Sequence, residues 1–207
     1  KYGCINQNGE ILVSFEYEAF YKLDNKYIQA KKDGKWGVID RNNNVIFDFI
    51  MDDYIRKLKF NSRGFLIKIK GKEGLMDENF KVVVPCKFEE IGVHYSWERE
   101  TDKNGWLMVK INDLWGWIDA NGKWKIEAKY SSVEPFDNQN FTIVKSPETN
   151  LYGIINKSGD YVLTANFNRI YNLDNYNIFQ ISKTINSKEK FAYYNALNNS
   201  LLTPFKY

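Results

Sequence analysis

The chain has 207 residues and is 43% hydrophobic, which is enough apolar content for one or two domains with a buried core. Its 29 basic and 26 acidic residues are interspersed and give a net charge of +3, whereas nucleic-acid-binding and anionic-membrane proteins usually carry a clustered excess of one sign. No apolar run approaches the roughly 20 residues of a transmembrane helix, so the composition predicts neither a nucleic acid partner nor membrane insertion.

A short motif recurs along the chain. It consists of an aromatic residue, a glycine directly after it, and Asp or Asn four residues after the aromatic. Four copies keep this pattern: Tyr2-Gly3 with Asn6, Trp36-Gly37 with Asp40, Trp115-Gly116 with Asp119, and Tyr152-Gly153 with Asn156. Two degenerate copies are Glu73-Gly74 with Asp77 and Phe191-Ala192 with Asn195. The anchors lie roughly 34 to 42 residues apart, a period typical of repeat proteins.

We therefore predict a single domain of about five and a half tandem units. The units span residues 1–34, 35–71, 72–113, 114–150, 151–189 and 190–207.

A first strand is predicted ahead of the anchor in most units. β-branched and aromatic runs with little helix character cover residues 27–31, 65–69, 106–110, 141–145 and 178–182. In the second copy, Lys32-Asp33-Gly34-Lys35 follows this strand, and Asp-Gly between two such runs is a strong signal for a tight hairpin.

The second predicted strand carries the anchor. Alternation places Trp36 and Val38 on one face, and Gly37 and Ile39 on the other. Because both faces are apolar, we expect the strand to be covered on both sides, with Trp36 and Trp115 buried. Glycine weakens a strand unless something approaches closely, so Gly37 is interpreted as a packing position.

A turn is predicted to begin at each Asp or Asn of the motif. Its side chain accepts hydrogen bonds from the backbone just ahead, and Gly or Asn three residues later takes the left-handed conformation of a bulged hairpin loop. Turn chemistry therefore explains these six residues, and no calcium loop is expected because such loops need several converging carboxylates.

A third strand follows the turn, and a recurring aromatic residue follows this strand. The strands are predicted at residues 11–13, 45–47, 82–84, 161–163 and 201–202. The aromatic stands fifteen residues past the anchor at Tyr17, Phe88, Tyr130 and Phe167. The second copy has Met51 at this position, and Tyr54 is a possible substitute.

These elements predict an all-β fold built of three-stranded antiparallel meanders with a crossing segment between them. The meanders can stack as an open superhelical, solenoid-like array, or close as a propeller-like ring of five or six blades. The last unit has its own first strand near Ile178, so it needs no strand donated by the N-terminus. The open array is therefore favoured.

At the level of motifs, the chain resembles the bacterial WG (KWG) repeat family. The resemblance is carried by residues 35–40, the loop to Asn43, Val45-Ile46 and residues 84–91, and it covers nearly the whole chain. Glu73 and Ala192 depart from the family pattern. The resemblance implies a mostly non-enzymatic module in a larger bacterial protein, often secreted or in the cell envelope, with an undefined ligand. A leader peptide missing from this chain fits that expectation.

The chemistry of the chain predicts no catalytic, cofactor-binding or metal-binding residue. His94 is the only histidine, and no Gly-rich phosphate loop is present. Cys4 and Cys86 lie at non-equivalent positions without a C-x-x-C spacing, so two free thiols are expected.

Binding of a protein or peptide is the leading functional prediction. The clearest departure from the repeat is residues 92–104, where His94, Tyr95, Trp97 and Arg99 are candidate partner contacts of types found at binding hot spots. The other interpretation of this segment is a tolerated insertion whose rings lie on the sheet.

A carbohydrate or cell-wall binder is the alternative prediction. Residues 116–124 look locally like the hairpins of bacterial choline- or wall-binding repeats. In that case Trp117 and Trp124 would be exposed and would stack on sugars or quaternary ammonium groups.

Overall fold

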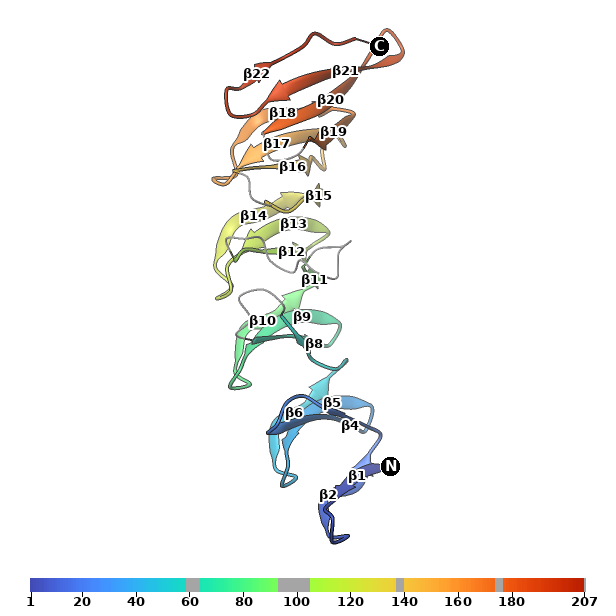
Figure 1. Ribbon diagram of the computed structural model, residues 1–207. Helices are drawn as coiled ribbons and strands as arrows, with labels where there is room; N and C mark the ends of the chain where they lie inside the picture. The colour runs from blue at the N-terminus through green and yellow to red at the C-terminus, as the bar shows by residue number, and fades with distance from the viewer. Residues whose placement is uncertain (59–63, 93–104, 137–139, 174–176, 207) are drawn as a thin grey trace. The chain divides into compact units, whose positions relative to one another are not determined.

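The computed structural model describes residues 1–58, 64–92, 105–136, 140–173 and 177–206, and all of its regular elements are β-strands (Figure 1). Six antiparallel sheets follow one another in chain order, and among the described residues none closes into a barrel. The chain divides into two compact units, Lys1–Glu90 and Ile91–Tyr207.

The first unit holds three sheets. The first sheet has two strands and the next two have four each, in sequential order. The strands are β1 (Tyr2–Ile5) and β2 (Ile11–Tyr17) in the first sheet; β3 (Ala19–Lys22), β4 (Tyr27–Lys32), β5 (Lys35–Asp40) and β6 (Val45–Met51) in the second; and β7 (Arg56–Lys57), β8 (Gly64–Ile69), β9 (Lys72–Asp77) and β10 (Val82–Phe88) in the third.

The second unit also holds three sheets, each of four sequential strands. The strands are β11 (Glu90–Ile91), β12 (Leu107–Ile111), β13 (Leu114–Ile118) and β14 (Trp124–Tyr130) in the fourth sheet; β15 (Ser132–Val133), β16 (Phe141–Lys145), β17 (Tyr152–Asn156) and β18 (Tyr161–Phe167) in the fifth; and β19 (Arg169–Asn172), β20 (Ile178–Ile185), β21 (Lys188–Asn195) and β22 (Ser200–Leu201) in the sixth.

The three strands of each predicted meander are present, and the structure adds a fourth. The segment after the buried aromatic, predicted only as a crossing segment, forms a short strand that pairs with the first strand of the next meander. In the second sheet this is β3, where Ala19 pairs with Lys31 and Tyr21 with Gln29. The aromatic thus ends one sheet, and the residues just after it begin the next.

The anchor strand is covered on both faces, as predicted. Trp36 and Val38 pack with residues of the third sheet, including Ile67. On the opposite face, Ile39 packs with Val13 and Tyr17 of the first sheet. Trp36 and Trp115 are each 7% exposed, which confirms that these anchors are structural.

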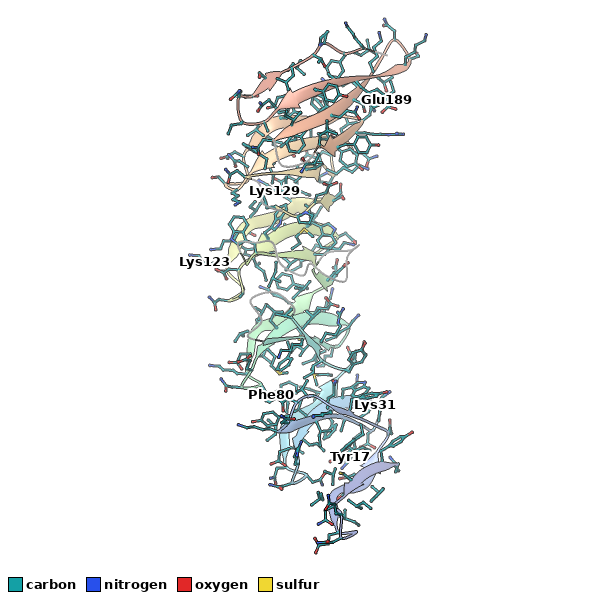
Figure 2. The ribbon with its side chains drawn as sticks, viewed as in Figure 1. Tyr17, Lys31, Phe80, Lys123, Lys129 and Glu189 are labelled. Atoms are coloured by element: carbon teal, nitrogen blue, oxygen red, sulfur yellow. The ribbon has the colours of Figure 1, made fainter. Side chains whose placement is uncertain are left out.

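The predicted turns are confirmed in five copies. In the second sheet, Asp40 Oδ1 accepts the backbone N–H groups of Asn42 and Asn44, both at 2.8 Å. The residues with the same role elsewhere are Asn6, Asp77, Asp119 and Asn156. The sixth copy differs, because Asn195 Oδ1 accepts the N–H groups of Leu197 and Asn198 and the left-handed residue is Asn199, four positions on. In the third copy, Phe80 takes the left-handed position with φ of 59°. Its ring stacks on Phe65, and it lies in the core between the second and third sheets (Figure 2).

Met51, and not Tyr54, occupies the place of the downstream aromatic in the second copy. Met51 is fully buried and lies opposite Trp36, just as Tyr130 lies opposite Trp115. Tyr54 is 48% exposed. The alternative assignment of Tyr54 to this core position was therefore wrong, and the flexible Met side chain fills the space there.

Within each unit, the residue just after the aromatic position links one sheet to the next. Its backbone N–H donates to a carbonyl of the following first strand, as from Asp52 to Lys68 and from Ser131 to Lys145. Its side chain can also cap the following hairpin, and Asp52 Oδ2 accepts the N–H of Gly71 at 2.6 Å. Within each unit, the sheets therefore stack in chain order with their cores between them, consistent with the solenoid-like array.

Candidate functional site

The sequence predicted four partner contacts in the segment 92–104. His94, Tyr95, Trp97 and Arg99 all lie outside the described residues. The prediction of a contact loop there stays a prediction.

The predicted pair of exposed tryptophans is not present. Trp117 is completely buried and packs against Tyr130 and Phe136, at ring-centroid distances of 6.2 and 5.2 Å. Trp124 is half-buried. The expectation of a stacking platform was wrong for Trp117, because this side chain occupies the core position that Val38 fills in the second sheet.

The described surface presents a different set of aromatic residues in the first unit. Tyr21 stacks on Trp36 with a centroid distance of 5.7 Å, and Tyr54 meets the same indole edge-on at 6.0 Å. The tyrosines are 56% and 48% exposed, whereas Trp36 is buried. Tyr21 lies on β3, and Tyr54 lies in the segment just before β7. A buried indole thus holds two partly exposed rings in place.

Cationic residues lie close to these tyrosines along the chain. Exposed Lys22 follows Tyr21 on β3, and exposed Arg56 and Lys57 form β7. Lys26 and Lys57 both act on the carboxylate of Asp24. Burial opposes the charge of this carboxylate, but backbone N–H groups of the Asp24 loop and then the two lysines outweigh it and lower its pKa. We call Tyr21, Lys22, Lys26, Tyr54, Arg56 and Lys57 the basic-aromatic patch.

The second sheet has an aromatic pair at the position where the third sheet has an ion pair. Tyr21 on β3 covers the anchor Trp36 on β5, and Arg56 on β7 covers the anchor position Glu73 on β9. The guanidinium Nη2 lies 3.2 Å from Glu73 Oε1. Glu73 is 7% exposed. An unpaired charge is costly to bury, and the Arg56 guanidinium offsets this cost for the Glu73 carboxylate. This pair explains how the third unit tolerates the loss of its anchor aromatic.

Arg56→Ala is expected to lower the unfolding free energy by about 1–3 kcal/mol, because the buried Glu73 carboxylate loses its guanidinium partner. We place the value below that of a fully buried pair because the Arg56 side chain is 49% exposed. Urea denaturation measures it. The double variant Arg56→Tyr, Glu73→Trp introduces the aromatic pair of the second sheet and should recover stability. A double variant no better than Arg56→Ala would contradict this equivalence.

Acid should weaken the links between sheets in the first unit. The N–H of Gly71 and then the ammonium of Lys35 lower the pKa of Asp52 below its usual 3.8. A lowered pKa in the folded state contributes stability that is present above the unfolded pKa and is lost as the pH falls below it. We expect thermal stability to be flat above pH of about 5 and to fall below about 4. Asp52→Asn should make this fall shallower in pH-dependent melting, and an unchanged acid slope would contradict the assignment.

The two cysteines are free and partly buried. Burial raises the pKa of the Cys86 thiol, which makes it a weak nucleophile. Its sulfur packs beside Gly74, where the second sheet has Phe49 beside Gly37. Among the described residues, no group of three or more His, Cys, Asp or Glu side chains is placed to hold a metal ion. The described part of the chain contains no helix long and apolar enough to cross a membrane.

Sequence reasoning missed the basic-aromatic patch because its tyrosines lie outside the repeated motif. Tyr54 was considered only as a core residue. The available signal was the alternation of rings and cations just after the buried aromatic position, at Tyr21-Lys22 and Tyr54 to Lys57. Only the stacking of sheets shows that these two segments are neighbours.

Comparison with known proteins gives one family match. The sequence model described as "WG containing repeat" matches residues 2–36, 74–96, 115–146 and 152–183, which together make up more than half of the chain. No curated protein matches this chain. Among solved structures, one titled "Crystal structure of the eukaryotic initiation factor" aligns with a TM-score of 0.49 and 11% sequence identity. The alignment covers 97% of this chain and 58% of that chain.

Proposed function

Because the chain belongs to the family of the WG containing repeat, which makes it a repeat module, we propose that it is non-enzymatic and binds a protein or peptide partner. The basic-aromatic patch supports this proposal best. Tyr21 and Tyr54 are about half exposed and are fixed against the buried Trp36. Tyrosine and arginine are enriched at protein interfaces, and a ring held in place before binding loses little conformational entropy.

The carbohydrate-binding alternative has no comparable support. It depended on two exposed tryptophans, and Trp117 is completely buried. Trp124 is half-buried, so it does not form a two-ring platform with Trp117. Protein binding is therefore the function that we propose.

Photo-crosslinking tests the proposal. We expect a benzophenone amino acid at Tyr54 to crosslink a protein from cells of the source organism, with unlabelled wild-type chain as competitor. The double variant Tyr21→Ala, Tyr54→Ala should compete about tenfold or more less well, because hot-spot residues contribute about 2 kcal/mol or more each. Melting temperatures of all variants confirm that the competitor is folded.

Tyr193 provides the matched control. It is 40% exposed and lies in the sixth sheet, away from the patch in sequence. Tyr193→Ala should compete as well as the wild-type chain. Equal competition by Tyr21→Ala, Tyr54→Ala and by Tyr193→Ala would exclude the patch as the binding surface, and no competable crosslink at Tyr54 would count against protein binding there.

A further inference from the structure

We propose that the basic-aromatic patch is the docking surface for an acidic, extended peptide segment. This inference rests on the protein-binding function proposed above and names the chemistry of the partner. Carboxylates of the peptide meet Lys22, Lys26 and Lys57, and its apolar side chains pack on the exposed rings of Tyr21 and Tyr54. The observations that carry it are the charge of the patch, its exposed rings and its open strand edges.

The cations of the patch exceed the acids that could neutralise them. Three acidic groups lie among these cations. Asp24 Oδ1 accepts the N–H groups of Lys26 and Tyr27 at 2.6 and 2.8 Å, Asp53 Oδ1 accepts the N–H of Tyr54 at 2.8 Å, and Glu73 pairs with Arg56. Among the described residues, Lys22, Lys26 and Lys57 form no ion pair within 4.0 Å. Lys26 and Lys57 act on Asp24 only from beyond ion-pair distance, so these ammonium groups and that of Lys22 can still pair with carboxylates of a partner.

The exposed rings add a contact that charge alone does not provide. A Tyr ring presents a rigid apolar face with a polar tip, which suits the side chains of a peptide bound at a surface. Tyr21 lies on β3 and Tyr54 just before β7, so a single segment lying across this part of the surface contacts both rings. The buried Trp36 indole contacts both rings.

The strand edges favour an extended conformation of the peptide. β3 and β7 are edge strands of the second and third sheets, so each pairs on one side only among the described strands. Open strand edges present unpaired N–H and C=O groups, which an extended peptide can use for backbone hydrogen bonds. Side chains of the patch then select for charge.

The same surface suits a nucleic acid less well. A nucleic acid backbone carries evenly spaced negative charges and binds best to a continuous positive groove. In the patch, Asp24, Asp53 and Glu73 lie among the cations. A peptide can place its carboxylates only opposite the lysines and its apolar groups opposite the rings. The interleaved charges therefore match a peptide of mixed acidic and apolar composition.

Fluorescence anisotropy with the full chain tests the inference. The probe is a fluorescein-labelled peptide of alternating Glu and Leu, with a Gln-Leu peptide, a Lys-Leu peptide and a single-stranded oligonucleotide as comparisons. We expect the Glu-Leu peptide to bind most tightly, and to bind more weakly as salt rises because the contacts lie at the surface. The double variant Lys22→Glu, Lys57→Glu should weaken binding about tenfold or more.

Lys123→Glu, Lys129→Glu is the matched control, since it reverses two exposed lysines at β14 of the second unit (Figure 2). It should change the affinity by less than about twofold. The neutral variant Lys22→Gln, Lys57→Gln should also weaken binding, which keeps the test valid if charge reversal unfolds the chain. Equal loss in patch and control variants, equal binding of the Gln-Leu peptide, or tighter binding of the oligonucleotide would overturn the inference.

The crosslinking experiment separates this inference from the proposed function. If Lys22→Glu, Lys57→Glu competes for the Tyr54 crosslink as well as the wild-type chain, the chain binds a protein but not through acidic groups. In that case the inference fails and the proposed function stands. Absence of any competable crosslink counts against the proposed function itself, whatever the peptides do.

Discussion

Gly116→Ala is expected to lower the unfolding free energy by about 3 kcal/mol or more, because its new methyl group has no room. A Cβ at this position would lie 2.6 Å from the backbone N of Ala128 and 2.6 Å from the carbonyl O of Ile126. Both atoms belong to the backbone of β14, so no side chain can rotate away. Urea denaturation of the variant measures the loss, which follows from the shape of the outer strand.

That outer strand bulges over the glycine. Trp115 pairs with Tyr130 and Trp117 with Ile126, so one residue of β13 lies opposite three residues of β14. The bulge brings Ala128 onto Gly116. It also twists an exposed sheet edge, which is a common protection against pairing with another chain.

The sixth sheet provides the control, because Ala192 already occupies this position there. Its outer strand β22 pairs Ser200 and Leu201 with Asn195 and Tyr194, and the chain then returns to bridge Lys206 with Phe191. The segment between these pairings accommodates the buried methyl group of Ala192. Ala192→Gly should therefore cost only about 0.5–1 kcal/mol, mainly through backbone entropy. If Gly116→Ala were no more destabilising than Ala192→Gly, the bulge would not be the reason for the glycine.

Features that depend on neighbouring residues in the sequence were predictable. The Asp33-Gly34 hairpin forms as expected, with Lys32 paired to Lys35 and positive φ at both central residues. The Asp and Asn turns form because the accepting side chain and its donors lie within four residues of each other. The alternation of Trp36 to Ile39 correctly assigned each residue to a face.

Features that depend on stacking were not predictable in the same way. The short strands such as β3 form because a neighbouring strand supplies their hydrogen bonds, and four residues carry too little pattern to indicate this. Phe80 adopts a left-handed φ of 59°, a backbone conformation that is unfavourable for an aromatic residue. Packing against Phe65 and Tyr27 offsets that cost, and both partners are distant in the sequence.

In the candidate site too, the sequence did not predict the features that depend on the stacking of sheets. Trp117 lies on the anchor strand, which alternation predicts to be covered on both faces, whereas the wall-binding alternative required the same ring to be exposed. The structure decides between these predictions, since Val144 and Ile155 of the fifth sheet close over the Trp117 cluster. Tyr21 and Tyr54 become neighbours only when the second and third sheets stack on each other.

Trp117→Ala is expected to lower the unfolding free energy by about 3–5 kcal/mol, as for other large-to-small core changes. The indole is completely buried among Tyr130, Phe136 and residues of the fifth sheet, so its removal opens a cavity that these rigid strands cannot close. Urea denaturation should show the loss as a lower midpoint. Trp124→Ala, at a half-buried position, should cost clearly less.

Trp117→Phe distinguishes core packing from ligand stacking. Trp117 Nε1 has no hydrogen-bond partner in the structure, so phenylalanine removes a buried unsatisfied donor while it keeps a ring in the core. We expect a loss of about 1–2 kcal/mol, well below that of alanine, because only part of the volume is lost. In a glycan array, the folded Trp117→Phe chain should behave as the wild type does. Loss of a glycan signal with stability retained would return Trp117 to the ligand-binding role that its burial argues against.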